Sequence, residues 1–282
     1  MQFHNPTSEI YVPDGAPADK ALARTTHLGI GAHQDDIEIM AFHGILECFG
    51  KNDKGFTSVT LTNGSGSARA GVYANYTDEQ MQTVRRTEQK KAAYLGDYSA
   101  HVSLDYTSSA VKDGKNTHVV EDLKRLLGAT KAQVIYTHNL ADKHDTHVSV
   151  VLQLIRALRE LPPDERPQKL YGCEVWRNLD WMNDKDKVVF DVSAHENLAA
   201  SLVGVFDSQI AGGKRYDLAT MGRRRANATY FESHATDAAT SVIFGIDLTP
   251  LIADVTLAPK DYVARFIQRF ADDVSSRLAK LS

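Results

Sequence analysis

The sequence predicts an α/β protein with a doubly wound, mostly parallel sheet flanked by helices, a Rossmann-like fold with C-terminal elaborations. Two observations predict this fold class. Short apolar runs alternate with amphipathic helical runs over the first 160 residues, a pattern typical of parallel sheets. Clusters of His and Asp follow two of the expected strands, and in such sheets ligands bind beyond the carboxyl ends of the strands.

The expected elements follow from apolar periodicity and from the turn residues between them. Residues 1–24, rich in Pro and polar side chains, predict an irregular arm, and residues 25–282 predict a single domain. The expected strands span residues 26–32, 56–61, 100–104, 133–137, 169–176, 188–192 and 239–246. The expected helices span residues 37–49, 78–95 (with Gly96 as the C-terminal cap), 119–127, 146–160, 194–206, 215–229 and 259–281. The apolar face of the last helix, which includes Phe266, Phe270 and Val274, is expected to pack against the domain.

Composition excludes several classes of partner. The chain has 32 basic and 36 acidic residues, a net charge of −4, so neither nucleic acid nor an anionic membrane is an expected partner. No window is apolar enough to span a bilayer and the first thirty residues lack the apolar core of a signal peptide, so a cytoplasmic protein is expected. Cys48 and Cys173 are too few for a disulfide framework. Assembly into a homo-oligomer is left open.

Two polar clusters form a candidate metal site. His33 and Asp36 follow the first long strand, with Asp35 between them, and a turn there can aim both side chains at one point. His144 and His147 begin the helix after the fourth strand, three residues apart and therefore on one face. Two imidazoles and one carboxylate with an open fourth position are a catalytic zinc arrangement, and Asp35 is placed to take a proton from water on the metal.

Each cluster alone has a simpler interpretation. Two consecutive aspartates after a strand often serve as a helix N-cap, and among 11 histidines some pairs at helical spacing arise by chance. Together the clusters carry more weight, because both lie where a strand passes into a helix and together they supply a ligand set and a base.

The same residues carry a family resemblance. The run from Ala32 to Glu38 (AHQDDIE) resembles the AHPDDxE signature of PIG-L/LmbE-like zinc-dependent N-deacetylases, and His144 to His147 resembles the second motif of that family. Further runs resemble the family at residues 62–64 (TNG), 85–96 (RRTE…LG), 206–209 and 221–232, so the resemblance covers roughly residues 25–235.

This resemblance implies a hydrolase that removes the N-acetyl group from an amino sugar or glycoconjugate. Carried over by position, it implies His33, Asp36 and His147 as ligands of Zn²⁺, or of another divalent ion, since such sites are permissive. It implies Asp35 as the general base for the metal-bound water, and His144 as the group that stabilises the oxyanion or protonates the leaving amine.

The sequence departs from the family pattern at two positions. Gln34 replaces the usual proline, which removes rigidity from the turn but no ligand. Thr146 stands where the family often has aspartate, so the carboxylate that supports His147 has to come from elsewhere. His144 lies at a helix N-terminus, which disfavours a charged imidazole. Unless Asp142 or Asp145 reaches its ring, we expect His144 to act as a neutral donor.

Three further residues are candidates for substrate binding, each with a structural alternative. The resemblance implies that Arg85 contacts substrate hydroxyls, whereas an ordinary surface ion pair with Glu88 is equally compatible. Asp105 follows a strand and could bind a sugar hydroxyl or simply be a solvated acid. Gly64 lets its loop turn closely past the substrate, or belongs to a flexible linker. For His138, a structural role is favoured over a catalytic one.

Three alternative functions are set against this interpretation by particular features of the sequence. A dinucleotide site is rejected, because the expected third glycine after Gly29 and Gly31 is Gln34. A zinc amidase acting on a larger acyl group or a thiol-sugar conjugate would use the same metal site. A glycan-binding protein without catalysis remains a third alternative, against which the presence of Asp35 speaks.

Overall fold

A computed structural model describes residues 1–282, and one eight-stranded sheet runs through it in the order β1-β4-β3-β2-β5-β6-β8-β7. Its five central strands, β4 to β6 in that order, are parallel. At the edges β1 is antiparallel to β4, β8 to β6 and β7 to β8. The strands are β1 Glu9–Tyr11, β2 His27–Gly31, β3 Phe56–Thr62, β4 Ala100–Tyr106, β5 Val134–His138, β6 Lys169–Cys173, β7 Val188–Asp191 and β8 Val242–Asp247.

The chain winds in two directions from β2. It passes to β3 and β4 on one side, then returns to place β5 and β6 on the other. This arrangement confirms the predicted fold class, with β7 and β8 as C-terminal elaborations. The adjacent strands β2 and β5 form the switch point at which doubly wound sheets bind their ligands.

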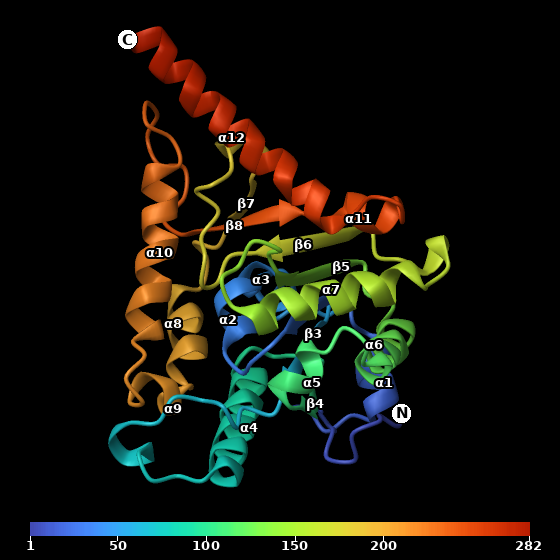
Figure 1. The fold of residues 1–282 in the computed structure, drawn as a ribbon. Coiled ribbons are helices and arrows are strands. Elements are labelled where there is room, and N and C mark those ends of the chain that lie inside the picture. The colour runs from blue at the N-terminus through green and yellow to red at the C-terminus, as the bar shows by residue number, and fades with distance from the viewer.

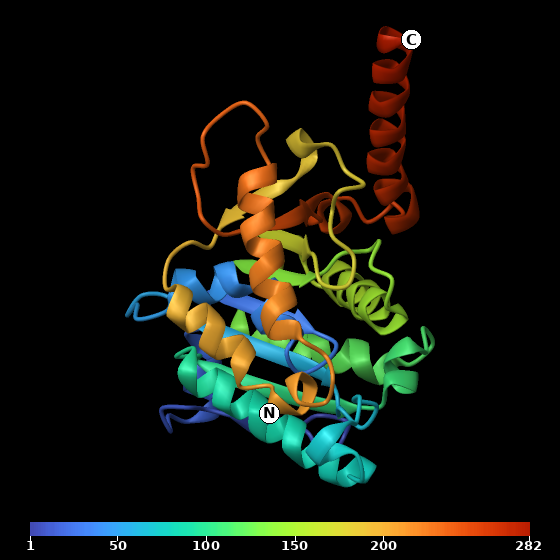
Figure 2. The same ribbon diagram turned by 90° about the vertical axis from the view of Figure 1, so that its left-hand side faces the viewer.

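Helices cover both faces of the sheet (Figures 1 and 2). One layer contains α1 Ala18–Ala23, α5 Ser108–Lys112, α6 Thr117–Thr130 and α7 Asp145–Arg159, with α11 Thr249–Ala253 beside α7. The other contains α2 Asp36–Met40, α3 Phe42–Cys48, α4 Asp78–Leu95, α8 Glu196–Gly204, α9 Asp207–Ile210 and α10 Tyr216–Tyr230. A cluster of 37 buried apolar residues lies under the first layer and one of 19 under the second, so each face of the sheet has its own core.

Helix α4 has the predicted bounds. Thr77 and Gln80 form a capping box, in which each side chain accepts the other residue's backbone N–H. Gly96 ends the helix as expected, but the left-handed residue is Asp97 (φ 54°) and not Gly96 (φ −83°). Gly96 is needed for packing instead, because a Cβ there would lie 2.3 Å from Cε1 of Tyr98.

Two predictions about local structure were wrong. Residues 1–24 are not wholly irregular, because they contain β1, which pairs with β4, and α1, which packs on α6. The helix expected over residues 37–49 is two helices that meet at Ala41. Arg224 of α10 donates to the carbonyl oxygens of Glu38 (2.8 Å) and Ile39 (3.0 Å), which a continuous helix would have used internally. No helix is long and apolar enough to cross a membrane.

Candidate active site

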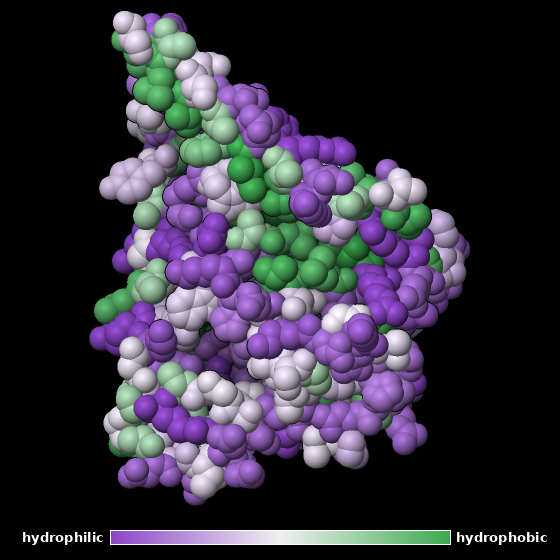
Figure 3. All heavy atoms as spheres, in the orientation of Figure 1, coloured by the Kyte–Doolittle hydropathy of each residue, from purple (hydrophilic) through white to green (hydrophobic).

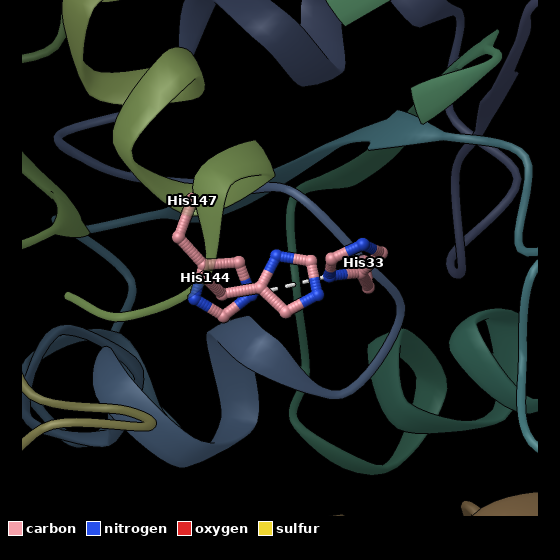
Figure 4. Close-up of side chains that lie close together, drawn as sticks. All are labelled: His33, His144 and His147. Carbon is pink, nitrogen blue, oxygen red and sulfur yellow. Dashed lines mark hydrogen bonds between the residues drawn. The ribbon is translucent and has the colours of Figure 1, made fainter. Parts of the chain in front are cut away.

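Both predicted clusters lie at the switch point of the sheet. The loop with His33, Asp35 and Asp36 directly follows β2, and His144 and His147 lie at the start of α7, which follows β5. Because β2 and β5 are parallel neighbours, their carboxyl ends bring the two loops together. Figure 4 shows the imidazoles of His33, His144 and His147 converging, with a line joining His33 to His147.

Three donor atoms form a small triangle between these loops. Nδ1 of His33 lies 3.2 Å from Oδ2 of Asp36 and 3.2 Å from Nε2 of His147. Nε2 of His147 lies 3.4 Å from the same Oδ2 atom of Asp36. A tetrahedral zinc ion with bonds of about 2.05 Å separates its ligand atoms by about 3.3 Å. The triangle therefore has the dimensions that one such ion requires.

The turn after β2 is held by its own polar groups. Asp35 has a left-handed backbone (φ 90°), and Oδ2 of Asp36 accepts the backbone N–H of His33 at 2.7 Å, which folds the loop back on itself. Gln34, in the place of the usual proline, donates from Nε2 to the carbonyl oxygen of Thr62 at 3.0 Å. A tertiary hydrogen bond to β3 thus supplies restraint that a proline ring would otherwise give.

Asp142 provides the support for His147 that the sequence left unassigned. Its Oδ2 lies 3.4 Å from Nδ1 of His147 and accepts the N–H of Trp176, and its Oδ1 accepts the N–H of His144. Burial raises the pKa of Asp142, but the hydrogen bond and charge of His147 outweigh it and hold that pKa below its usual value. A carboxylate at Nδ1 leaves the Nε2 lone pair of His147 directed at Asp36 and His33.

His138 is close enough to compete as a ligand. Its Nε2 lies 3.4 Å from Oδ2 of Asp36, so Asp36, His138 and His147 form a second possible metal set. However, Nε2 of His138 accepts the backbone N–H of Ala32 at 2.9 Å, which occupies its lone pair. The ring stacks on His147 with centroids 3.8 Å apart. This geometry suits a residue that supports the triangle of His33, Asp36 and His147.

His144 lies over the triangle, half-buried. Its ring stacks on His147 (centroids 4.5 Å apart) and meets His33 edge-on (4.9 Å). Burial, followed by the charge of His33, lowers the pKa of His144. Asp142 bonds the backbone of His144 and not its ring, and no hydrogen bond joins the ring to Asp145. Neither Asp142 nor Asp145 reaches the ring, so the expectation that His144 is a neutral imidazole stands.

Asp35 is buried beside the triangle and paired with Arg85. Nη2 of Arg85 lies 3.0 Å from Oδ2 of Asp35. Burial raises the pKa of Asp35 to about 7 against the opposing charge of Arg85. A carboxyl group with a pKa near neutrality is suited to accept and release a proton at physiological pH.

Arg85 is engaged with protein groups rather than with open space. The ion pair with Glu88, expected as the structural alternative, does form, since Nη1 of Arg85 lies 3.0 Å from the Glu88 carboxylate. It is buried and not at the surface, because Arg85 is only 1% exposed. The same nitrogen donates to Oγ of Ser208, and Nη2 also donates to the carbonyl oxygen of Gln34. Arg85 does line the pocket, but these contacts make it a group that orients Asp35.

Glu88 extends this network to α9. Its Oε1 accepts the N–H of Ser208 at 2.6 Å and its Oε2 accepts the Ser208 hydroxyl at 2.8 Å. The Arg85 guanidinium lies 5.4 Å from the ring centroid of Phe206. The run at residues 206–209 that carried part of the resemblance therefore has a structural explanation, because it packs against Arg85 and Glu88, and Arg85 holds Asp35.

A pocket of about 520 Å³ opens over these groups. Gly64 lines it with φ 78°, and a Cβ there would lie 2.8 Å from Oε1 of Gln34 and 2.9 Å from Cγ of Arg85. The loop therefore turns closely over the Asp35 network. Asp105 was expected near substrate, but it is not part of the pocket lining and its carboxylate pairs with Arg86 at 2.6 Å. The structure speaks against a role for Asp105 in binding.

The C-terminal half of the chain supplies a wall of the pocket that was not predicted. These residues follow β6 or lie on and before α10, and they are Glu174, Val175, Trp176, Lys214, Tyr216, Arg223 and Arg224. Lys143 and Lys214 both lie near the Trp176 ring, at 5.7 and 5.2 Å from its centroid. Arg223 and Arg224 fall in the run 221–232 that resembles the family, but no motif marked the others, since their proximity to the His clusters depends on how β6 and α10 pack.

The family comparison covers the strands and loops that build this site. Residues 28–158 match the PIG-L family, described as GlcNAc-PI de-N-acetylase. This segment of the chain therefore resembles the PIG-L family. The PIG-L match runs from β2 to the end of α7 and includes both polar clusters. A search of curated proteins found no match.

Solved structures resemble this protein over most of its length. They include the N,N'-diacetylchitobiose deacetylase of Pyrococcus horikoshii (14% identity, TM-score 0.62, 81% of this chain and 85% of that one). The A40926 pseudoaglycone deacetylase Dbv21 is similar at 14% identity and TM-score 0.57, over 79% and 97% of the two chains. The 4-carboxy-2-hydroxymuconate hydratase GalB of Pseudomonas putida KT2440 is also similar (14%, TM-score 0.55, 79% and 96%). At this identity the likeness establishes the fold, and the hydratase illustrates that one fold can serve different reactions.

Proposed function

We propose that this protein is a metal-dependent hydrolase that removes the N-acetyl group from an amino sugar or a glycoconjugate. The observation that carries the proposal is the triangle of His33, Asp36 and His147 with the buried carboxyl group of Asp35 beside it. The PIG-L family and the two deacetylases among the structural neighbours support the same reaction class.

The residues present fit a bound divalent cation. Two imidazole nitrogens and one carboxylate oxygen are the ligand types that zinc takes in hydrolytic sites, and Asp142 supplies a carboxylate behind His147. When bound there, the metal would polarise the acetyl carbonyl and make water more acidic. His33, Asp36 and His147 would hold it, in preference to a set that includes His138.

Asp35 would accept the proton released when water adds to the acetyl carbon. Arg85 holds the Asp35 carboxylate in place through Nη2, and Glu88 fixes the guanidinium through Nη1. A base braced in this way loses little orientation freedom when the substrate arrives. The same carboxyl group could then deliver the proton to the departing amine nitrogen.

His144 would stabilise charge on the carbonyl oxygen. Its half-buried ring lies against His33 and His147 and lines the pocket. A neutral imidazole donates one N–H, and a single well-placed donor to a developing oxyanion is worth about 3 kcal/mol. The Gly64 loop and Trp176 on the opposite pocket wall would position the sugar.

The test is acetate release across a panel of acyl sugars. We expect zinc-loaded protein to release acetate from N-acetylglucosamine or one of its glycosides, and a chelator to abolish the reaction. Release of a longer acyl chain with no release of acetate would favour the amidase alternative. Binding of the glycans without turnover of any of them would overturn the proposed function.

A further inference from the structure

Helix α12 (Pro259–Leu281) leaves the body of the protein after its second turn. Tyr262, Val263 and Phe266 are buried, whereas every residue from Ile267 onward is exposed. Figures 1 and 2 both show the helix projecting well beyond the sheet and its helical layers. The prediction that the whole apolar face packs against the domain is therefore wrong for the outer four turns.

The projecting part carries a continuous apolar stripe, visible as green atoms along the helix in Figure 3. The exposed fractions of its large apolar residues run from 36% for Phe270 to 77% for Leu281. The stripe consists of Ile267, Phe270, Val274, Leu278 and Leu281. Steps of three and four residues keep them on one side of the helix. A helical segment of this length is marginally stable alone in water, and one that also exposes an apolar stripe is typical of an interface.

The stripe forms one wall of a groove of about 950 Å³. The opposite walls come from residues 178–187 and from the end of α10, where Tyr230 is 84% exposed. Phe270, Val274 and Leu278 line the groove, together with Phe231. The groove is open at the surface, and charged residues such as Asp180, Lys185 and Arg223 line it beside these apolar side chains.

We propose that this groove receives helix α12 of a second copy of the chain, antiparallel and centred on Val274. A two-fold axis at that point places Val274 against its own equivalent. Phe270 then faces Leu278 of the second copy, and Ile267 faces its Leu281. Each pair joins residues already exposed, so the same stripe supplies both halves of an isologous interface.

The charges beside the stripe favour a second copy over an unrelated helix. Asp273 and Arg277 lie on one flank, already 3.2 Å apart within a copy. In the antiparallel register, Arg277 of one copy lies within two residues along the helix of the position that faces Asp273 of the other copy. The two-fold axis repeats this contact, so the interface contains two pairs of opposite charge. The other flank presents Ala271 and Ser275, whose small side chains let two helices approach closely.

The first test is sedimentation velocity of the full chain over a range of concentrations. We expect a dimer that Val274→Glu dissociates with a dissociation constant raised about 100-fold or more, since the axis places two buried carboxylates side by side. Ser276→Glu introduces the same charge on the opposite face of the helix and should leave the dimer intact. A wild-type chain that is monomeric at high micromolar concentration would overturn the proposal.

Charge reversal and cross-linking test the register itself. Asp273→Arg should weaken the dimer, and adding Arg277→Asp should restore it. Val274→Cys should form an intermolecular disulfide on mild oxidation and Ser276→Cys should not, while Cys48 and Cys173 are buried and do not compete. A dimer that is indifferent to Val274→Glu, or that cross-links equally well through both positions, refutes this interface. Circular dichroism of each variant checks that α12 remains helical.

Discussion

The substitution Asp142→Asn tests how the proposed metal site is held. The Asp142 carboxylate accepts from Nδ1 of His147 and from two backbone N–H groups, those of His144 and Trp176. An amide in its place removes the negative charge and can present an NH₂ group to Nδ1. That contact would favour the wrong tautomer, with the proton on Nε2 where the metal should bind.

The expected loss follows from that one contact. Removing a carboxylate behind a ligating histidine typically weakens metal binding about 10–100-fold, or about 1.4–2.7 kcal/mol. We expect Asp142→Asn to raise the zinc dissociation constant by this factor in competition with a chromophoric chelator, a measurement that does not require turnover. Asp145→Asn is the matched control, because Asp145 begins α7 three residues later, has an exposed side chain and should leave zinc affinity unchanged.

An unchanged zinc affinity in Asp142→Asn would refute this reasoning. It would show that His147 is oriented by other groups, or that His147 does not bind the metal. Thermal unfolding of the metal-free variant separates a loss of affinity from a general loss of structure.

Three further predictions concern the proposed base Asp35, the loop over it and the sheet. Asp35→Asn should lower kcat about 100- to 10,000-fold while zinc content by metal analysis stays at the wild-type level; full turnover would remove Asp35 from the mechanism. Gly64→Ala should destabilise the protein by about 1–3 kcal/mol in urea unfolding, because φ is positive and the new Cβ meets Arg85, whereas Gly66→Ala, with open space around it, should have little effect. Burial lowers the pKa of His101 from 6.5 to about 3. Between pH 3 and pH 6.5 the His101 ring therefore binds a proton only in the unfolded chain, and the free energy of unfolding falls as the pH drops below 6.5. By pH 5 the cost is about 2 kcal/mol, and His101→Gln should reduce that acid sensitivity in denaturation curves; an identical pH dependence would contradict it.

The elements of the parallel sheet were predictable because their signals are local. Apolar runs bounded by turn residues marked β2, β3 and β5, and the capped, amphipathic sequence of α4 set its bounds. The break between α2 and α3 had no such signal. It depends on Arg224, nearly two hundred residues away along the chain, which binds the carbonyl oxygens at the end of α2.

Some residues of the candidate site could likewise be predicted from local sequence, and others could not. His33, Asp36 and His147 could be proposed together because two short motifs each follow a strand, and parallel strands end at one edge. Asp142 could not be chosen over Asp145, since only the path of the loop after β5 decides which carboxylate reaches Nδ1 of His147. The burial of Arg85 and the pairing of Asp105 with Arg86 likewise depend on tertiary packing.

Diffraction from zinc-soaked crystals, with data on both sides of the zinc absorption edge, tests the metal site most directly. The predicted result is a single anomalous peak bonded to Nδ1 of His33, Oδ2 of Asp36 and Nε2 of His147, with Asp35 uncoordinated beside it. A map with no peak between those atoms, or with an ion bound through His138 and His33 turned away, would contradict it.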